Sequence, residues 1–221
     1  MVTSMTELWQ IYYDEKQKVN CFPFANLYYN PTLTIFFESS IIKELVLSTK
    51  ADKIGVCSWK LAEKMRMRVG YKTPLTQEAL NSDYQVLSFS RNSSRHQMMA
   101  MANVWHKDFK STITLLWEKL GYKIPGEAKH PIYQNHYAAQ TSIYRDYVEN
   151  FLSPAMELTL SDEELNKKML QPSGYGALQR NCDLKSVKQK LGMSDYPIAP
   201  FILERCVSLW FTMKHIPVTY L

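Results

Sequence analysis

Two charged residues, Glu204 and Arg205, interrupt the otherwise apolar stretch APFILERCVSLWF at positions 199–211. A charge in such surroundings costs free energy unless it is paired or takes part in binding or chemistry. On a helix, Glu204 and Ser208 share a polar stripe, whereas adjacent residues do not face each other. We therefore expect Glu204 and Arg205 to have different partners, which are either groups elsewhere in the protein or a substrate.

A second candidate lies in the strand-like segment at 131–140, where Asn135 and His136 interrupt the apolar pattern. Because neighbouring strand residues point to opposite faces, one of the two would face a ligand crevice. The alternative is a histidine held by a backbone carbonyl, and the pattern leaves both open. Cys57, at the end of an apolar run, could act as a nucleophile with a histidine base, but a buried structural thiol is the favoured interpretation.

The motifs of several enzyme classes are absent from the sequence. There is no D-x-D triplet, no pair of histidines at i and i+4, no phosphate-binding glycine loop and no G-x-S-x-G. Asp162 and Glu164 form a D-x-E, which is typical of the first turn of a helix. The pattern therefore disfavours kinases, P-loop and Rossmann proteins and common hydrolases. It gives no support for a divalent metal or any other cofactor.

The elements that must position these residues alternate between strands and helices. This order predicts an α/β fold, a three-layer sandwich with a mostly parallel sheet. The strands are expected at 8–15, 52–59, 82–90 and 131–140, with an edge strand at 215–221. The main helices are expected from Asn30-Pro31 to about 47, at 94–120, either continuous or broken midway and ending at Gly121, from Thr141 or Ser142 onward, and between Pro200 and Pro217.

We expect one domain over residues 1–221, with a mobile helical insert at 160–196 before the last helix. In the insert, Ser161 with Glu164 would form a capping box, and Asp183 would cap a second short helix. Ligands of parallel α/β sheets bind beyond the carboxyl ends of the strands. The places where a ligand would bind are therefore Asp14–Glu15, Ser58–Lys60, Ser90–Asn92 and Asn135–Gln140.

Composition indicates an ordinary globular chain. It has 221 residues, 46% of them apolar and 21% charged, and a net charge of +5. A mild positive charge fits an anionic small ligand, an acidic membrane surface or nucleic acid, but no base-reading motif occurs, so nucleic acid is not expected. There is no signal-peptide pattern and no apolar run of about 20 residues. We expect a cytoplasmic protein, compatible with peripheral contact at the inner membrane, whose thiols are reduced: Cys21, Cys57, Cys182 and Cys206.

Several segments together resemble a family of bacterial glycosyltransferase-like proteins from capsule and exopolysaccharide clusters. The segment ADKIGVCSWKL resembles the family pattern D-Y-[IV]-G-L-C-H-Y-R-R, with Ser58 in place of the histidine and Lys60 at the first basic position. The segment NHYAAQTSIYRDYV resembles a later family motif. The closing segment matches F-[LI]-x-E-R-L-x-x-x-W-L through Phe201, Ile202, Glu204, Arg205 and Trp210.

The resemblance implies a GT-A fold and transfer of a sugar from a nucleotide-sugar donor to a glycan or lipid-linked glycan acceptor. It implies Glu204 and His136 as catalytic residues and Asn135 as an acceptor contact. Lys60 would supply positive charge at the donor diphosphate in place of a metal. The donor-binding residues implied are Tyr12, Tyr13, Ser58, Trp59, Lys60 and Arg205.

Two other functions remain open from the residues alone. One is a non-catalytic module that binds a nucleotide or a glycan on the same fold. The other is an assembly or structural protein, which would expose a large apolar patch.

Overall fold

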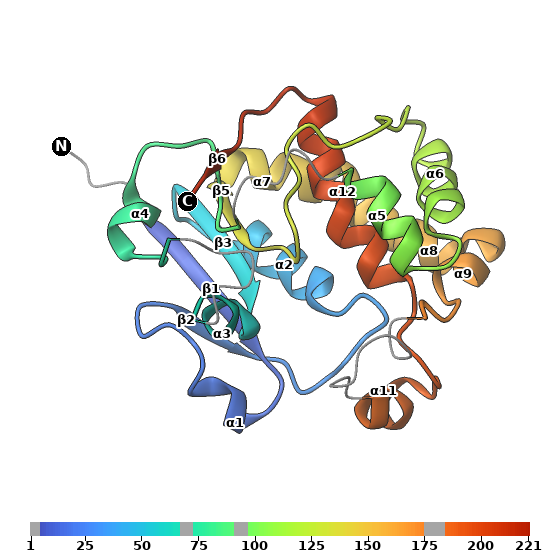
Figure 1. Cartoon of the computed structure of the whole chain (residues 1–221), viewed down its shortest axis with the longest axis horizontal. Coiled ribbons are helices and arrows are strands. Elements are labelled where there is room, and N and C mark those ends of the chain that lie inside the picture. Colours follow the sequence, from blue (N-terminus) through green and yellow to red (C-terminus); the bar gives the residue numbers. More distant parts are fainter. Residues whose placement is uncertain (1–4, 67–72, 91–96, 175–183) are drawn as a thin grey trace.

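The computed structural model describes residues 5–66, 73–90, 97–174 and 184–221. Its centre is a six-stranded sheet in the order β2-β1-β3-β5-β4-β6 (Figure 1). Strand β1 pairs in parallel with β2 and β3, and β4 with β6, whereas β5 runs antiparallel to β3 and β4. The predicted α/β class with a mostly parallel sheet is confirmed. The strands are β1 (Thr6–Tyr12), β2 (Asn26–Tyr29), β3 (Lys53–Ser58), β4 (Val86–Ser88), β5 (Tyr137–Gln140) and β6 (Thr219–Tyr220).

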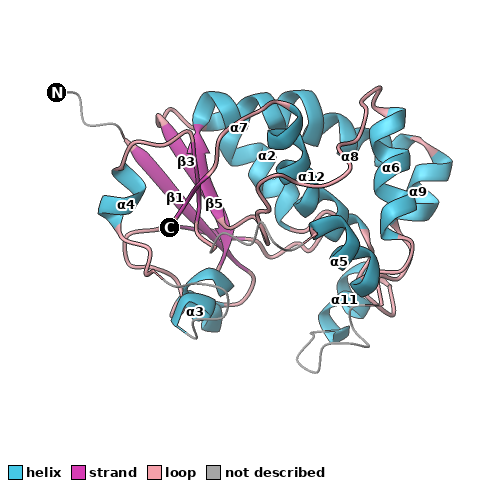
Figure 2. Ribbon diagram, turned by 45° about the horizontal axis from the view of Figure 1, so that its top comes forward, coloured by secondary structure: helices cyan, strands magenta, loops and turns pink. Residues whose placement is uncertain are grey.

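Side chains of the sheet alternate between two apolar cores. In β3, Ile54 and Val56 join the larger core, whereas Cys57 joins the smaller one on the opposite face. Helices α2 (Glu38–Ser48), α7 (Thr141–Tyr147) and α12 (Ala199–Met213) contribute to the larger core, and α3 (Lys60–Arg66) and α4 (Gln77–Asn81) to the smaller one (Figure 2). The sheet is thus covered on both faces, which explains why β3 reads as an almost continuous apolar run.

Gly55 is required by the close packing of β3 against β5. A Cβ atom at this position would lie 3.0 Å from the Tyr137 carbonyl oxygen and 3.1 Å from Leu8 Cδ1. Both contacts are shorter than ordinary van der Waals separations, so only glycine fits without a shift of a neighbour.

The chain between β1 and α2 differs from the prediction. The sequence predicts a loop at 16–30, but α1 (Glu15–Lys18) and edge strand β2 occupy much of this segment. The Asn30 N–H continues the strand by donating to the Tyr12 carbonyl at 2.8 Å, and the Asn30 side chain accepts from Thr32 N at 3.2 Å. Helix α2 begins only at Glu38, after a turn in which the Phe37 N–H donates to the Thr34 carbonyl at 3.1 Å. The residue before it, Phe37, has φ 49° and ψ −123°.

The helix expected at 94–120 is broken midway, the second of the two predicted alternatives, into α5 (Met98–Trp105) and α6 (Phe109–Lys119). The break lies at Asp108, whose φ of 60° is left-handed. Gly121 ends α6 as predicted, with φ 79° and its N–H bonded to the Glu118 carbonyl. From Thr141 the chain stays helical through α7, a π-helical turn η1 (Val148–Leu152) and α8 (Ser153–Ser161).

In the segment expected to be an insert, α9 (Glu163–Met169) packs into the larger core through Leu165 and Met169. Its N-cap is Asp162, which accepts from Leu165 N at 2.8 Å, so the predicted Ser161 capping box was wrong. Helix α11 (Leu184–Leu191) follows. Asp183 and the rest of 175–183 lie outside the described residues, and the mobility of the insert stays a prediction.

The last helix, α12, runs from Ala199 to Met213, close to the limits that the flanking prolines predict. The chain then forms the predicted edge strand, β6, beside β4. Across the described part of the chain, no helix combines the length and apolar character needed to cross a bilayer.

Candidate functional site

The carboxyl ends of β1 and β3 carry several of the residues of interest. The Trp59 N–H extends the pairing of these strands by donating to the Ile11 carbonyl at 2.9 Å. Helix α3 then begins at Lys60. Lys60 and Lys64 are one turn apart and therefore share a face of α3. Lys60 is exposed and Lys64 is half-buried.

Glu38, the first residue of α2, brings a carboxylate to the same place. Burial raises the pKa of Glu38, the Glu204 carboxylate adds to the rise, and Lys60 opposes it. Burial also raises the pKa of Tyr13, and the nearby Glu38 carboxylate raises it further. Glu38 is thus within electrostatic range of Tyr13, Lys60 and Glu204, which come from three other parts of the chain.

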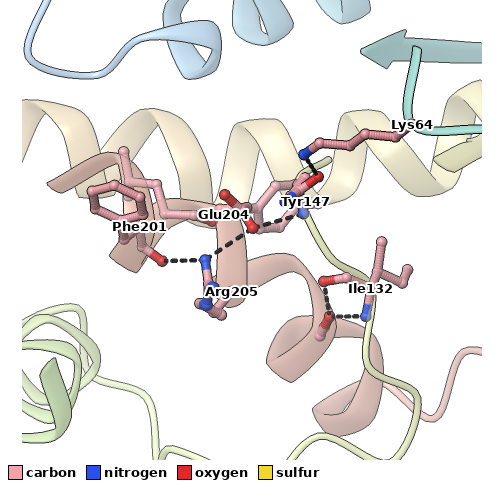
Figure 3. A network of polar contacts seen from close by, with 9 residues as sticks. Lys64, Ile132, Tyr147, Phe201, Glu204 and Arg205 are labelled. Atoms are coloured by element: carbon pink, nitrogen blue, oxygen red, sulfur yellow. Dashed lines mark hydrogen bonds and ion pairs between the residues drawn. The ribbon is translucent and has the colours of Figure 1, made fainter. Parts of the chain in front are cut away.

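Glu204 and Arg205 form a direct ion pair, contrary to the prediction that they have different partners. Arg205 Nη1 donates to Glu204 Oε1 at 2.9 Å and to the Phe201 carbonyl at 3.4 Å (Figure 3). The two side chains are only 15% and 14% exposed. Their long, bendable side chains meet although their Cβ atoms diverge, which backbone spacing alone does not show.

The polar stripe of α12 fastens the loop that precedes β5. Glu204 Oε1 accepts the Gln134 N–H at 2.6 Å. One turn further along, the Ser208 hydroxyl accepts the Ile132 N–H at 2.8 Å and donates to the Ile132 carbonyl at 3.3 Å. Glu204 and Ser208 thus bind the backbone of the same loop. These hydrogen bonds explain why α12 carries the predicted polar stripe of Glu204 and Ser208.

The loop ends in a strained turn. Gln134 and Asn135 have φ values of 62° and 54°, and the His136 N–H donates to the Tyr133 carbonyl at 3.2 Å. Left-handed backbone at consecutive residues other than glycine costs on the order of 1–3 kcal/mol per residue and persists only where other contacts hold it. Here Glu204 holds the backbone, and Lys64 Nζ donates to Gln134 Oε1. The turn also explains why β5 begins at Tyr137 and not at 131.

Lys64 has an unusual ionisation. The pKa of Lys64 is lowered to about 8, mainly by burial, with Glu204 opposing the change and Lys60 adding to it. Lys64 is therefore mostly charged at pH 7 but loses its charge slightly above it. A lysine with a low pKa beside two carboxylates and a second lysine is typical of a site that binds or transforms a charged ligand.

Asn135 and His136 take different positions. His136 is fully buried, and burial together with the charge of Lys64 holds the pKa of His136 well below its usual value, so the ring is neutral at pH 7. The Asn135 carbonyl accepts from Cys57 Sγ at 3.4 Å. Burial raises the pKa of Cys57, which keeps the thiol protonated and argues against a nucleophile.

The remaining predicted residues border the cluster or lie apart from it. Lys60 Nζ lies 5.7 Å from the Trp59 ring, and the Ser58 carbonyl accepts from Gln10 Nε2 at 3.3 Å. Tyr12 instead packs on Tyr29 with ring centroids 5.2 Å apart, away from Tyr13 because strand neighbours point to opposite faces.

Sequence reasoning missed Glu38, Lys64 and Gln134. Glu38 lies inside the helix predicted to start seven residues earlier, and Lys64 belongs to a basic stretch at 64–72 that is typical of a solvated surface. An acid that follows an apolar segment and begins a buried helix is the signal that points to Glu38.

Among the described residues, no three His, Cys, Asp or Glu side chains gather as metal ligands. Comparison of the chain with protein-family models, with curated proteins and with solved structures gives no significant match.

Proposed function

We propose that the chain is a GT-A type glycosyltransferase that acts in the cytoplasm in surface polysaccharide synthesis. It would transfer a sugar from a nucleotide-sugar donor to a glycan or lipid-linked glycan acceptor. The observation that carries the proposal is the position of Lys60 and Lys64 on α3, directly after the carboxyl edge of parallel strands β1 and β3 and within electrostatic range of Glu38. The resemblance of the segments around Lys60 and Glu204 supports the same function.

The donor diphosphate would bind at α3. Lys60 and Lys64 share one face of this helix, and Lys64, whose pKa is about 8, is mostly charged at pH 7. Two ammonium groups at one place balance the negative charge of a diphosphate and stabilise the charge that develops on the leaving nucleotide. Trp59, which is partly exposed beside Lys60, offers a ring face for a sugar or a base.

Glu38 is the better candidate for accepting a proton from the acceptor hydroxyl. A carboxylate with a raised pKa is a stronger base near neutral pH than an ordinary one. Glu204 Oε1, by contrast, already accepts from Arg205 and from Gln134. We therefore assign Glu204 and Arg205 to positioning Gln134 and, through it, Lys64. His136 supports the turn from inside the core.

A transfer assay with a panel of UDP-, GDP- and CMP-sugars tests the assignment. With the active donor, Glu38→Gln should lower kcat by about 10²–10⁴-fold, the range of general base catalysis. Glu157→Gln on the exposed face of α8 is the control and should leave kcat unchanged. Full activity of Glu38→Gln would exclude Glu38 as the base.

The two hydrogen bonds that Glu204 Oε1 accepts also favour a second candidate, because this carboxylate serves structure and not catalysis. The second candidate is a non-catalytic module that binds a nucleotide or a glycan. This candidate predicts binding of a nucleotide sugar that depends on Lys60 and Lys64, with neither transfer nor hydrolysis of any donor in the panel.

A further inference from the structure

Helix α5 is apolar on its exposed face as well as on its buried one. Met98, Met99 and Ala102 are buried in the larger core. On the other side Met101, Val104 and Trp105 are 39%, 83% and 45% exposed. A surface helix normally turns polar residues to water, so three large apolar side chains on the outer face indicate a contact surface.

These three side chains form one patch. Met101, Val104 and Trp105 are spaced i, i+3 and i+4, so they are neighbours on the helix surface. The other exposed large apolar residues lie one to a segment, before β1, in the α1 C-cap, in β2, in α2 and in α8: Met5, Val19, Tyr29, Leu47 and Leu160. Only the α5 face therefore offers several adjacent apolar side chains at once within the described residues.

The patch lies next to the candidate site. Helix α5 crosses over the first half of α12 in both views (Figures 1 and 2). The His106 ring at the end of α5 stacks on Phe201 with centroids 4.1 Å apart. Arg205, one turn further along α12, is close enough for its charge to lower the pKa of His106. A partner on the outer face of α5 would therefore sit at the margin of the cluster around Glu204 and Lys64.

The charge around the patch fits an anionic partner. Lys107 and Lys110 follow the patch and are exposed, with one acid, Asp108, between them. Before Asp108, the sequence contains no acidic residue back to Asp83. Apolar side chains that include tryptophan, flanked by lysines, are the combination that inserts into the boundary between headgroups and acyl chains of anionic lipid.

We propose that the Met101–Val104–Trp105 face of α5 docks on the surface of an anionic phospholipid bilayer. The three apolar side chains enter the headgroup region, and Lys107 and Lys110 face the lipid phosphates. Docking does not require the proposed glycosyl transfer. If both hold, docking brings the site to the surface from which a lipid-linked acceptor extends.

Co-sedimentation of the full chain with vesicles tests the proposal. Vesicles of phosphatidylglycerol and phosphatidylcholine should bind the protein, vesicles of phosphatidylcholine alone should bind it much less, and added salt should weaken binding. Val104→Glu should lower the partition coefficient about tenfold or more, since it places a carboxylate in the contact. Val19→Glu is the matched control, because Val19 is 81% exposed, and it should bind as the unmodified protein does.

Tryptophan fluorescence adds a second readout. A blue shift on adding anionic vesicles should appear in the unmodified protein and be much smaller in Trp105→Phe. The proposal is overturned if no vesicle binds, or if Val19→Glu weakens binding as much as Val104→Glu. It is also overturned if light scattering shows a dimer that Val104→Glu dissociates while vesicles leave the protein unbound, since the patch would then join two copies.

Discussion

Glu204 and Arg205, immediate neighbours on α12, share a hydrogen bond of 2.9 Å through Glu204 Oε1, and the same oxygen accepts the Gln134 N–H at 2.6 Å. This arrangement ties α12 to the strained turn before β5. Because Gln134 in turn accepts from Lys64, the pair connects α12 to α3 across the carboxyl edge of the sheet. The charged pair occurs in this apolar helix because Glu204 binds the backbone of the turn at Gln134.

Loss of the Glu204 charge should destabilise the protein. Glu204→Gln removes the ion pair and weakens the bond to Gln134 N, and bonds to charged, largely buried groups are worth about 1.5–3 kcal/mol. We expect urea unfolding to show a loss of about 1–3 kcal/mol. Glu157→Gln breaks an exposed ion pair with Lys43 and should change stability by less than about 0.5 kcal/mol. Equal effects of the two variants would contradict the anchoring role.

Gly55→Ala should destabilise the sheet, because the added methyl would meet the Tyr137 carbonyl and Leu8. Overpacking of this kind costs about 1–3 kcal/mol. Gly126→Ala is the matched control, since no atom lies within 4 Å of a Cβ placed there, and it should be neutral or slightly stabilising. Thermal unfolding of both variants measures the difference. A Gly55→Ala protein as stable as the control would show that β3 and β5 can separate without cost.

Stability should fall as the pH is lowered from about 6.5 to 4. Burial and the charge of Arg205 lower the pKa of His106 from 6.5 to about 4, so the unfolded chain binds a proton in this range that the folded chain does not. The change corresponds to ~3 kcal/mol at most. His136, whose pKa is also lowered, acts in the same direction. Urea unfolding at pH 7 and pH 4.5 measures the loss, and His106→Gln should reduce it. An unchanged slope in that variant would contradict the assignment to His106.

Binding of a nucleoside diphosphate should weaken as the pH rises from 7 to 9. Lys64 is mostly protonated at pH 7 and mostly neutral at pH 9, because burial and Lys60 lower its pKa to about 8. The affinity should fall by up to about tenfold, as measured by isothermal titration calorimetry. Lys64→Arg keeps its charge at both pH values and should show a flatter profile. Identical profiles for the two proteins would exclude Lys64 from the anion site.

The sequence predicts the parts of this fold that depend on periodicity. The apolar runs locate β1 and β3, and prolines and Gly121 locate the ends of α6 and α12. It does not predict the late start of α2, which follows a turn at 34–37 and a positive φ at Phe37. It does not predict a left-handed turn at Gln134 either, because the contacts that hold the turn come from α3 and α12.

Some residues of the candidate site can also be predicted from the sequence, whereas others cannot. Lys60 and Glu204 are accessible to sequence reasoning because each follows or interrupts an apolar run. Glu38 and Lys64 become candidates only when the fold places the start of α2 and the helix that follows β3 at the same edge of the sheet. The ion pair of Glu204 with Arg205 depends on side-chain conformation, which residue spacing does not determine.

The most direct test of the central claim is a thermal-shift titration with nucleotide sugars. A ligand that binds only the native state stabilises it by about 2.7 kcal/mol at a hundredfold excess over its Kd. We predict that at least one UDP-, GDP- or CMP-sugar raises the Tm, that the rise is largely lost in a Lys60→Ala, Lys64→Ala double variant, and that Lys43→Ala on α2 retains it. If no nucleotide sugar shifts the Tm, or if the double variant responds like the unmodified protein, the cluster at the carboxyl edge of β1 and β3 is not a donor site.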